Sequence, residues 1–256
     1  ADMVSALRES GHIGAMIGDG VNDVRALKRA DLGIAMGAGV PASRAVAQAV
    51  LLDNRFSALP IVMSEGRRVI ANAERVAKLF LTKSAWAMLL ALLVALLDMP
   101  YPFLPRHITL VGSLTIGVPA FFLALMPNPR RYEPGFVQRT LRFAVPTGAV
   151  IAIALVVMNL MAARAGVTPE HAQTLSTLVL GLVGLGVIAI LEWPLSGWRM
   201  GVVAAMAAGL VLAFAIPFVR SFFSLAVPSF TEAAIALCVA VAVTGTIAAI
   251  TALLRA

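Results

Sequence analysis

The sequence predicts an α/β segment followed by an all-α membrane domain of six transmembrane helices. Short strands and helices alternate along the first part of the chain, which is typical of a parallel sheet. Six long apolar stretches then follow one another. Of the 256 residues, 60% are apolar and 13% are charged, against about 25% charged in an average soluble domain. The excess apolar surface is therefore expected to face lipid.

Residues 1–64 form the α/β segment in this interpretation. An amphipathic helix over 1–10 is expected to end at Gly11, because glycine readily adopts the left-handed conformation of a helix end. The further strands and helices are expected at 13–17, 22–29, 32–35, 41–48 and 49–52. Three strands are few for a complete parallel domain, and the chain opens at Ala1 inside a helix. We therefore expect an upstream remainder of the same polypeptide.

From Phe56 onward the pattern becomes helical and stays so. Residues 65–83 are expected to form a stalk helix that runs from water into the first span, and residues 84–256 to form the membrane domain. Each apolar stretch is close to the length of about 20 residues that crosses a bilayer. The predicted spans are about 78–98, 108–126, 141–163, 174–191, 200–219 and 232–254.

Lysine and arginine residues predict the orientation of the spans. Ten of them fall on one side of the predicted membrane: Arg67, Arg68, Arg75, Lys78, Arg130, Arg131, Arg139, Arg142, Arg199 and Arg255. Three fall on the other side: Arg106, Arg164 and Arg220. By the positive-inside rule, the α/β segment and the C-terminus are cytoplasmic. The basic residues flank apolar spans rather than forming a run interleaved with aromatics, so nucleic acid is not an expected partner.

Residues 17–23, Ile-Gly-Asp-Gly-Val-Asn-Asp, carry the main candidate site. A carboxylate between a parallel strand and a helix N-terminus suits Mg²⁺ and phosphate. Asp19 is the expected Mg²⁺ ligand, and Gly18 and Gly20 let the backbone approach closely. Asn22 could donate its amide to a phosphoryl oxygen, and Asp23 could bind the metal directly or through a water. The competing interpretation is that Asn22 or Asp23 merely caps the helix.

Residues 17–37, from Ile-Gly-Asp-Gly-Val-Asn-Asp to Ile-Ala-Met-Gly, resemble the hinge motif of P-type cation-transporting ATPases. That motif lies in a phosphorylation domain of the haloacid dehalogenase-like superfamily, so residues 1–64 look like the C-terminal part of that domain. Ser64-Glu65-Gly66-Arg67 and the six spans that follow look like the stalk and the fifth to tenth membrane helices of such a pump. One departure is Arg25, where the family often has proline.

The resemblance implies an ATP-driven pump that works with Mg²⁺ through an aspartyl-phosphate, with Asp19 as the Mg²⁺ ligand and Asn22 and Asp23 in support. The phosphorylated Asp-Lys-Thr-Gly motif is not in the sequence. The nucleotide domain and the first four membrane helices of the family have no counterpart here either. ATP would be bound mainly by the upstream remainder, and this chain alone is expected to be inactive. The implied location is the cell membrane, which the chain crosses several times.

A possible path for the transported metal cation lies around Thr115. Pro119 has no N–H, so the carbonyl of Thr115 loses its helical partner and the helix is expected to unwind locally. Ser84, Ser113 and Lys83 are further candidates along this path, although Lys83 could simply extend to the membrane surface. The segment resembles a bacterial branch of the family that includes mycobacterial members thought to carry calcium, so calcium is the first candidate ion.

Two other functions remain open from the sequence. A membrane-tethered phosphatase of the haloacid dehalogenase-like superfamily would use the same Asp19 loop on soluble phosphoesters. A non-enzymatic membrane module or channel would not need Asp19 or Asp23 at all. Glu192, which precedes Trp193-Pro194 at the end of a predicted span, is expected to lie at the membrane interface.

Overall fold

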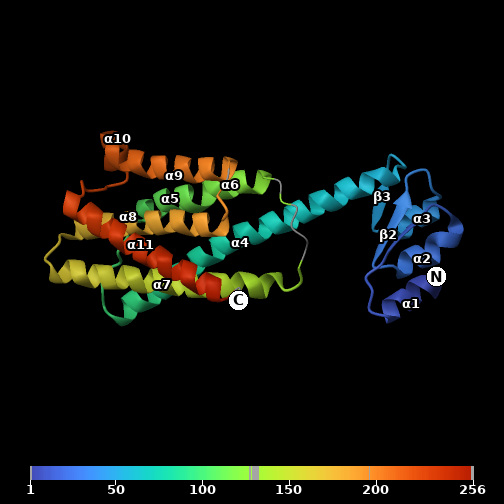
Figure 1. Cartoon of the computed structure of the whole chain (residues 1–256), viewed down its shortest axis with the longest axis horizontal. Helices are drawn as coiled ribbons and strands as arrows, with labels where there is room; N and C mark the ends of the chain where they lie inside the picture. The colour runs from blue at the N-terminus through green and yellow to red at the C-terminus, as the bar shows by residue number, and fades with distance from the viewer. Residues whose placement is uncertain (1, 127, 129–132, 196, 255–256) are drawn as a thin grey trace. The chain divides into compact units, whose positions relative to one another are not determined.

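The computed structural model describes residues 2–126, 128, 133–195 and 197–254 (Figure 1). The chain divides into two compact units, Ala1–Gly66 and Arg67–Ala256. Arg130, Arg131 and Arg255, which entered the prediction of orientation, lie outside the described residues.

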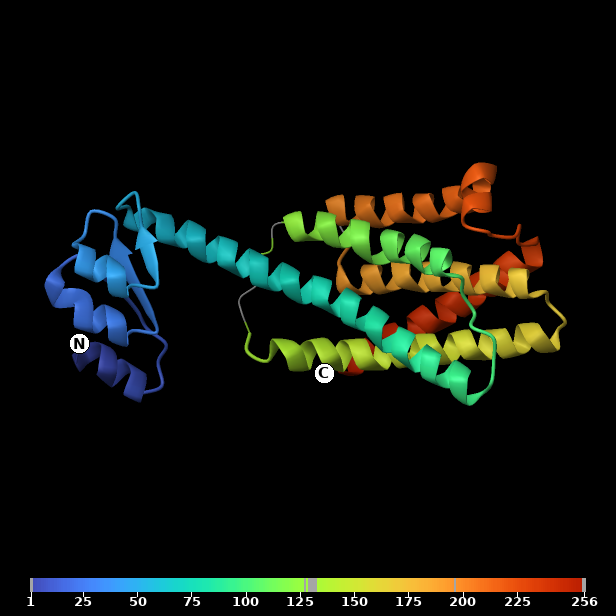
Figure 2. The same ribbon diagram turned by 180° about the vertical axis from the view of Figure 1, so that it is seen from behind.

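The first unit contains a parallel sheet of three strands, β1 (Ala15–Gly18), β2 (Leu32–Met36) and β3 (Ala49–Leu51), in the order β1-β2-β3. Helices α1 (Asp2–Glu9), α2 (Val24–Arg29) and α3 (Pro41–Val46) lie on one side of the strands (Figures 1 and 2). A 3₁₀ turn, η1 (Val21–Asp23), leads into α2. The predicted strand–helix alternation is confirmed, with boundaries shifted by a few residues.

Local sequence explains where these elements end and how closely they pack. Gly11 takes a φ of 80°, and its N–H donates to Arg8 while that of His12 donates to Leu7, so the last turn of α1 closes as predicted. Leu27 of α2 is fully buried. A Cβ on Gly33 of β2 would lie 2.5 Å from the carbonyl oxygen of Leu27, so glycine at this position permits the close contact between α2 and the sheet.

Helix α4 runs without a break from Leu59 to Leu96, preceded by the 3₁₀ turn η2 (Phe56–Ala58). This confirms the helix predicted to begin near Phe56. The second apolar stretch is α5 (Pro105–Gly112), a π turn η3 (Ser113–Gly117) and α6 (Val118–Leu125). The remaining long helices are α7 (Phe136–Arg164), α8 (Pro169–Leu191), α9 (Trp198–Ala215) and α11 (Phe230–Leu253). Among the described residues, six helical segments are long and apolar enough to cross a membrane.

The fifth of these helices ends earlier than predicted. Helix α9 stops at Ala215, and a short helix α10 (Pro217–Phe222) follows in place of the last residues of the predicted span 200–219. Ile216 precedes a proline and is extended, with φ −84° and ψ 115°. Steric clash with the ring of the following proline disfavours the helical conformation at such a residue, which explains the break.

Helix α8 is the most buried of the six, with 61% of its apolar window inside the protein, and Figure 2 shows it lying among the other helices of its unit. Glycines bring the helices close together. A Cβ on Gly186 of α8 would lie 2.5 Å from the Thr244 hydroxyl oxygen on α11, and one on Gly148 of α7 would lie 2.5 Å from the Ala85 Cβ on α4. Small residues at crossings of this kind are the usual means of packing helices in lipid.

Candidate functional site

Asp19 is the first residue after β1, at the carboxyl end of the strand. Its side chain is exposed and makes no hydrogen bond or ion pair with a residue that the structure describes. In open parallel sheets, ligands bind outside the carboxyl ends of the strands. The Asp19 carboxylate therefore lies where it would contact a ligand bound at the carboxyl end of β1.

Asp23 folds back and holds the loop that carries Asp19. One carboxylate oxygen of Asp23, Oδ2, accepts hydrogen bonds from the backbone N–H groups of Asp19 at 3.2 Å and Gly20 at 3.1 Å. A Cβ on Gly18 would lie 2.5 Å from the Asp23 Cβ, so only glycine at this position leaves room for the carboxylate. In this structure the Asp23 side chain stabilises the loop through these hydrogen bonds, and its other carboxylate oxygen remains for a ligand or a water.

The loop after β2 supports the same turn from the other side. The backbone N–H of Val40 donates to the carbonyl of Asp19 at 2.9 Å. The hydroxyl of Ser43, which is fully buried, donates to the carbonyl of Gly20 at 2.6 Å. The sequence reasoning did not single out Ser43, because nothing in Pro-Ala-Ser-Arg distinguishes a supporting hydroxyl from an ordinary helical serine.

The donor set suits Mg²⁺ as part of a site. Mg²⁺ binds through one or two carboxylates together with water and substrate phosphate oxygens. Asp19 offers a carboxylate with no competing partner among the described residues, and Asp23 offers one further oxygen. No cluster of three or more histidine, cysteine or acidic residues occurs among the described residues. Asn22 is exposed in the 3₁₀ turn that leads into the following helix.

A small cavity of about 30 Å³ lies inside the helical unit. Helix α4 contributes Thr82, Lys83 and Trp86, which share one face at helical spacing, and the second span contributes Gly112 and Thr115. A Cβ on Gly112 would lie 3.3 Å from the Lys83 ammonium. A chamber of this size holds about one or two waters or a single ion.

The π turn η3 forms the wall of this cavity that carries Thr115. The N–H of Val118 donates to the carbonyl of Ser113, five residues earlier. The chain is therefore not unwound as expected. Because Pro119 lacks an N–H, the helix widens by one residue and continues. The Thr115 hydroxyl is buried and donates to the Val111 carbonyl at 2.7 Å, which leaves its oxygen lone pairs free to face a ligand.

Two candidates from the sequence do not reach the cavity. Ser84 and Ser113 are exposed, and the Ser84 hydroxyl donates to the carbonyl of Phe80. The structure places Thr82 there instead. Thr82 is 4% exposed, and its hydroxyl has no hydrogen-bond partner among the described residues. Successive residues of a helix are rotated by about 100° about its axis. Thr82 and Ser84, two positions apart, therefore project from different sides of α4, and only Thr82 faces the cavity.

Glu192 lies just after α8, where the sequence placed it, but it is buried rather than interfacial, at 1% exposure. Its carboxylate oxygen Oε2 lies 3.3 Å from Arg75 of α4 and 3.5 Å from Arg199 of α9. Burial raises the pKa of Glu192 above its ordinary value, and the two arginines oppose that shift. The hydropathy pattern did not predict the burial of Glu192, because a carboxylate at a helix end is normally exposed to water.

Comparison with known proteins identifies the family of this chain. A model of the haloacid dehalogenase-like hydrolase family matches residues 9–63, so the first unit belongs to that class. The calcium-transporting ATPase CtpE of Mycobacterium bovis is 47% identical over 96% of this chain and 33% of its own length. The CtpE of Mycolicibacterium smegmatis is 45% identical over 87% of this chain and 30% of its own length. A probable cation-transporting ATPase, exp7, of Streptococcus pneumoniae is 32% identical over 77% and 26%.

The chain therefore belongs to the family of P-type cation-transporting ATPases. It spans about a third of the length of the curated relatives it matches. The matched haloacid dehalogenase-like region and the six apolar helices agree with the domain type and the membrane character predicted from the sequence.

Proposed function

We propose that this chain is the C-terminal part of an ATP-driven pump that moves a metal cation across the cell membrane through an aspartyl-phosphate intermediate. The relatives are named as calcium- or cation-transporting ATPases, and the chain covers 33% of the first of them. Calcium is the first candidate ion, because the mycobacterial relatives are named for it.

At the phosphate site, Asp19 would hold Mg²⁺, and Asn22 would donate its amide to a phosphoryl oxygen. Asp23 would fix the backbone of Asp19 and Gly20 through the two hydrogen bonds that its carboxylate accepts from them. When bound, Mg²⁺ would offset negative charge on the phosphate. The Asp-Lys-Thr-Gly motif does not occur in the sequence, so the phosphorylated aspartate and most of the ATP site would come from the upstream remainder. By itself this chain is not expected to hydrolyse ATP.

In the membrane, the cation path would pass the cavity between α4 and the second span. Thr82 and Thr115 offer buried hydroxyl oxygens to a hard cation, and oxygen ligands are what such ions prefer. Lys83 already brings a positive charge to the cavity, and no carboxylate lines it among the described residues. A divalent ion would therefore need carboxylates from elsewhere in the polypeptide, and Lys83 would have to move aside as it enters.

The orientation proposed for the intact protein has the first unit and the C-terminus in the cytoplasm. The support is the excess of lysine and arginine at one set of span ends. Phosphorylation by cytoplasmic ATP requires the Asp19 loop to lie on that side.

The observation that carries the proposal is the exposed Asp19 carboxylate, without a partner among the described residues, on a backbone fixed by Asp23 and Val40. In the full-length polypeptide, Asp19→Asn should abolish formation of an acid-stable phosphoenzyme from ATP and Mg²⁺. Asp53→Asn is the matched control, because Asp53 is an exposed aspartate that follows β3, at the far side of the same sheet from β1.

Normal phosphorylation of the Asp19→Asn protein would reject the pump assignment. Hydrolysis of soluble phosphoesters that needs Mg²⁺ but is not stimulated by a transported cation would favour the tethered phosphatase. Cation flux that survives replacement of both Asp19 and Asp23 would favour the channel or non-enzymatic module.

A further inference from the structure

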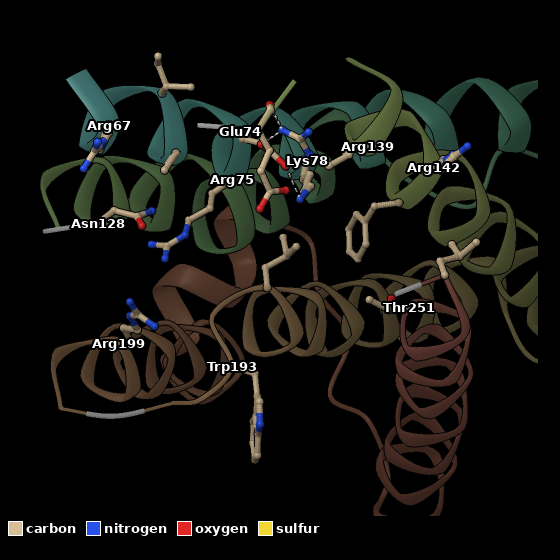
Figure 3. A pocket seen from close by; sticks show the side chains of 16 residues that line it. Arg67, Glu74, Arg75, Lys78, Asn128, Arg139, Arg142, Trp193, Arg199 and Thr251 are labelled. Carbon is tan, nitrogen blue, oxygen red and sulfur yellow. Dashed lines mark hydrogen bonds and ion pairs between the residues drawn. The ribbon is translucent and has the colours of Figure 1, made fainter. Parts of the chain in front are cut away.

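A second, larger pocket of about 570 Å³ lies in the helical unit (Figure 3). It shares no lining residue with the small cavity. Helices α4 and α7 form one wall, and the segments before α9 and at the end of α11 form the other. Its volume falls in the usual range of ligand pockets, about 300–1,000 Å³. None of the roles proposed above uses it.

The lining of this pocket is strongly cationic. Six basic side chains reach it: Arg67, Arg75, Lys78, Arg139, Arg142 and Arg199. The carboxylates there are Glu74 and Glu133, with Glu192 buried behind the wall. Six positive charges against three negative ones leave an excess of three among the described residues.

The pairing inside the pocket leaves some of these cations without a counter-charge. Glu74 lies between Lys78 and Arg139, at 2.9 Å from each, as the dashed lines in Figure 3 show. Arg67 and Arg142 make no hydrogen bond or ion pair with a described residue. They lie towards opposite ends of the pocket in Figure 3, so the uncompensated charge spans its whole width.

Apolar side chains also line the pocket, together with Asn128 and Thr251. Phe143 and Leu191 form part of the wall, and Leu254 and Trp193 stand at its edge with 53% and 73% of their surfaces exposed. Tryptophan is enriched at the level of the lipid headgroups. Cations beside an apolar, tryptophan-edged rim suit a ligand that is anionic at one end and apolar at the other.

We propose that this pocket binds the phosphate headgroup of an anionic phospholipid. Basic pockets between transmembrane helices on the cytoplasmic side are known to receive such headgroups. Arg67 and Arg142 supply the attraction, and the wall formed by Phe143 and Leu191 receives the first part of the acyl chains. A free phosphate would use the same cations but gain nothing from that wall. The inference depends on the membrane character of the chain, not on its pumping activity.

The test measures binding to the full-length polypeptide in a neutral detergent by native mass spectrometry. The probes are dioctanoyl phosphatidylglycerol, dioctanoyl phosphatidylcholine and inorganic phosphate. Phosphatidylglycerol should bind and phosphatidylcholine should not. The double variant Arg67→Gln/Arg142→Gln should weaken phosphatidylglycerol binding by roughly fivefold for each arginine removed. Added salt should weaken it further, because partly exposed charges are screened.

The matched control is Arg164→Gln/Arg220→Gln, which removes two arginines near the other ends of the helices and should leave binding unchanged. A thermal unfolding curve for each variant separates loss of the site from loss of the fold. Equal binding of phosphatidylcholine, an unchanged affinity in the Arg67/Arg142 variant, or displacement of the lipid by an equal concentration of inorganic phosphate would each overturn the proposal.

Discussion

The side-chain amide of Asn72 on α4 donates a hydrogen bond of 2.9 Å to the carbonyl of Met126, just after α6. The same amide donates to the carbonyl of Ala124 at 3.0 Å. Asn72 is 3% exposed, and its own side-chain oxygen accepts from Asn128. The last carbonyls of a helix have no partner within it. A polar residue in the middle of α4 therefore closes the end of the second span.

Replacing Asn72 with leucine should destabilise this junction. The buried carbonyl of Met126 and the partly buried carbonyl of Ala124 would lose their donor, and each unsatisfied buried polar group costs about 1–3 kcal/mol. We expect the free energy of unfolding in detergent to fall by that order, measured by denaturant titration. Val69→Leu, at an exposed position of the same helix, should have little effect. Equal stability of the Asn72→Leu protein would show that water replaces the amide.

Gly18→Ala should impair the phosphate site without touching Asp19 itself. The added Cβ would overlap the Asp23 Cβ, 2.5 Å away, and overpacking of this kind costs about 1–3 kcal/mol. Asp23 would then release the backbone of Asp19 and Gly20. In the full-length protein, phosphoenzyme formation should require a higher Mg²⁺ concentration. Gly14→Ala is the matched control, since a Cβ there would meet nothing within 4 Å. An unchanged Mg²⁺ requirement would argue against a role for Asp23 in stabilising the Asp19 loop.

Thr115→Val and Thr82→Val should each weaken the affinity for the transported cation, because each removes a buried hydroxyl from the cavity while keeping the shape of the side chain. Loss of one hydrogen bond or ligand contact of about 0.5–1.5 kcal/mol corresponds to a decrease of roughly two- to tenfold. The measurement is the cation concentration that half-activates ATP hydrolysis. Thr109→Val, an exposed threonine on α5 whose hydroxyl also bonds the carbonyl four residues earlier, should not change it.

Glu192→Gln should leave the fold as stable as before or more stable at neutral pH. Both carboxylate oxygens of Glu192 are buried without a hydrogen bond to a described residue, and burial raises the pKa of this carboxyl. Burial therefore favours the neutral form of Glu192 in the folded state. The Nη1 of Arg75 is buried, but the Arg75 and Arg199 side chains keep 18% and 27% of their surfaces exposed, so water partly offsets the loss of their counter-charge.

The sign of the pH dependence follows from that raised pKa. At low pH, Glu192 is neutral in the folded and the unfolded protein and contributes no difference. As the pH rises above the unfolded value of about 4.3, the unfolded state loses the proton first, so the wild type loses stability until the raised folded pKa is passed. The Gln variant should lack this loss, whereas Glu170→Gln, at an exposed position of α8, should keep it. The measurement is an unfolding curve of each variant at pH 4 and pH 7. A large destabilisation of the Glu192→Gln protein at pH 7 would contradict the expected stability.

The strand–turn–helix around Asp19 and the six spans could be predicted because they depend on local pattern. Glycine at the turn, alternating apolar runs and stretches of about 20 apolar residues constrain the backbone wherever they occur. The partners of individual side chains could not be predicted in the same way. The sequence favoured Asp23 as a ligand and kept a helix cap as the competing interpretation. Only the structure shows that the Asp23 carboxylate accepts hydrogen bonds from the backbone N–H groups of Asp19 and Gly20.

By itself, the sequence determined the class of this protein: a haloacid dehalogenase-like α/β segment joined to six membrane helices, with Asp19 at a strand end. Only the tertiary structure decided which polar residues of those helices face inward. Thr82 lines the cavity and Ser84 does not, and Glu192 is buried between two arginines. The physical reason is that hydropathy is averaged over all sides of a helix. The environment of one polar side chain depends on the side of the helix from which it projects and on the neighbours that pack against that side.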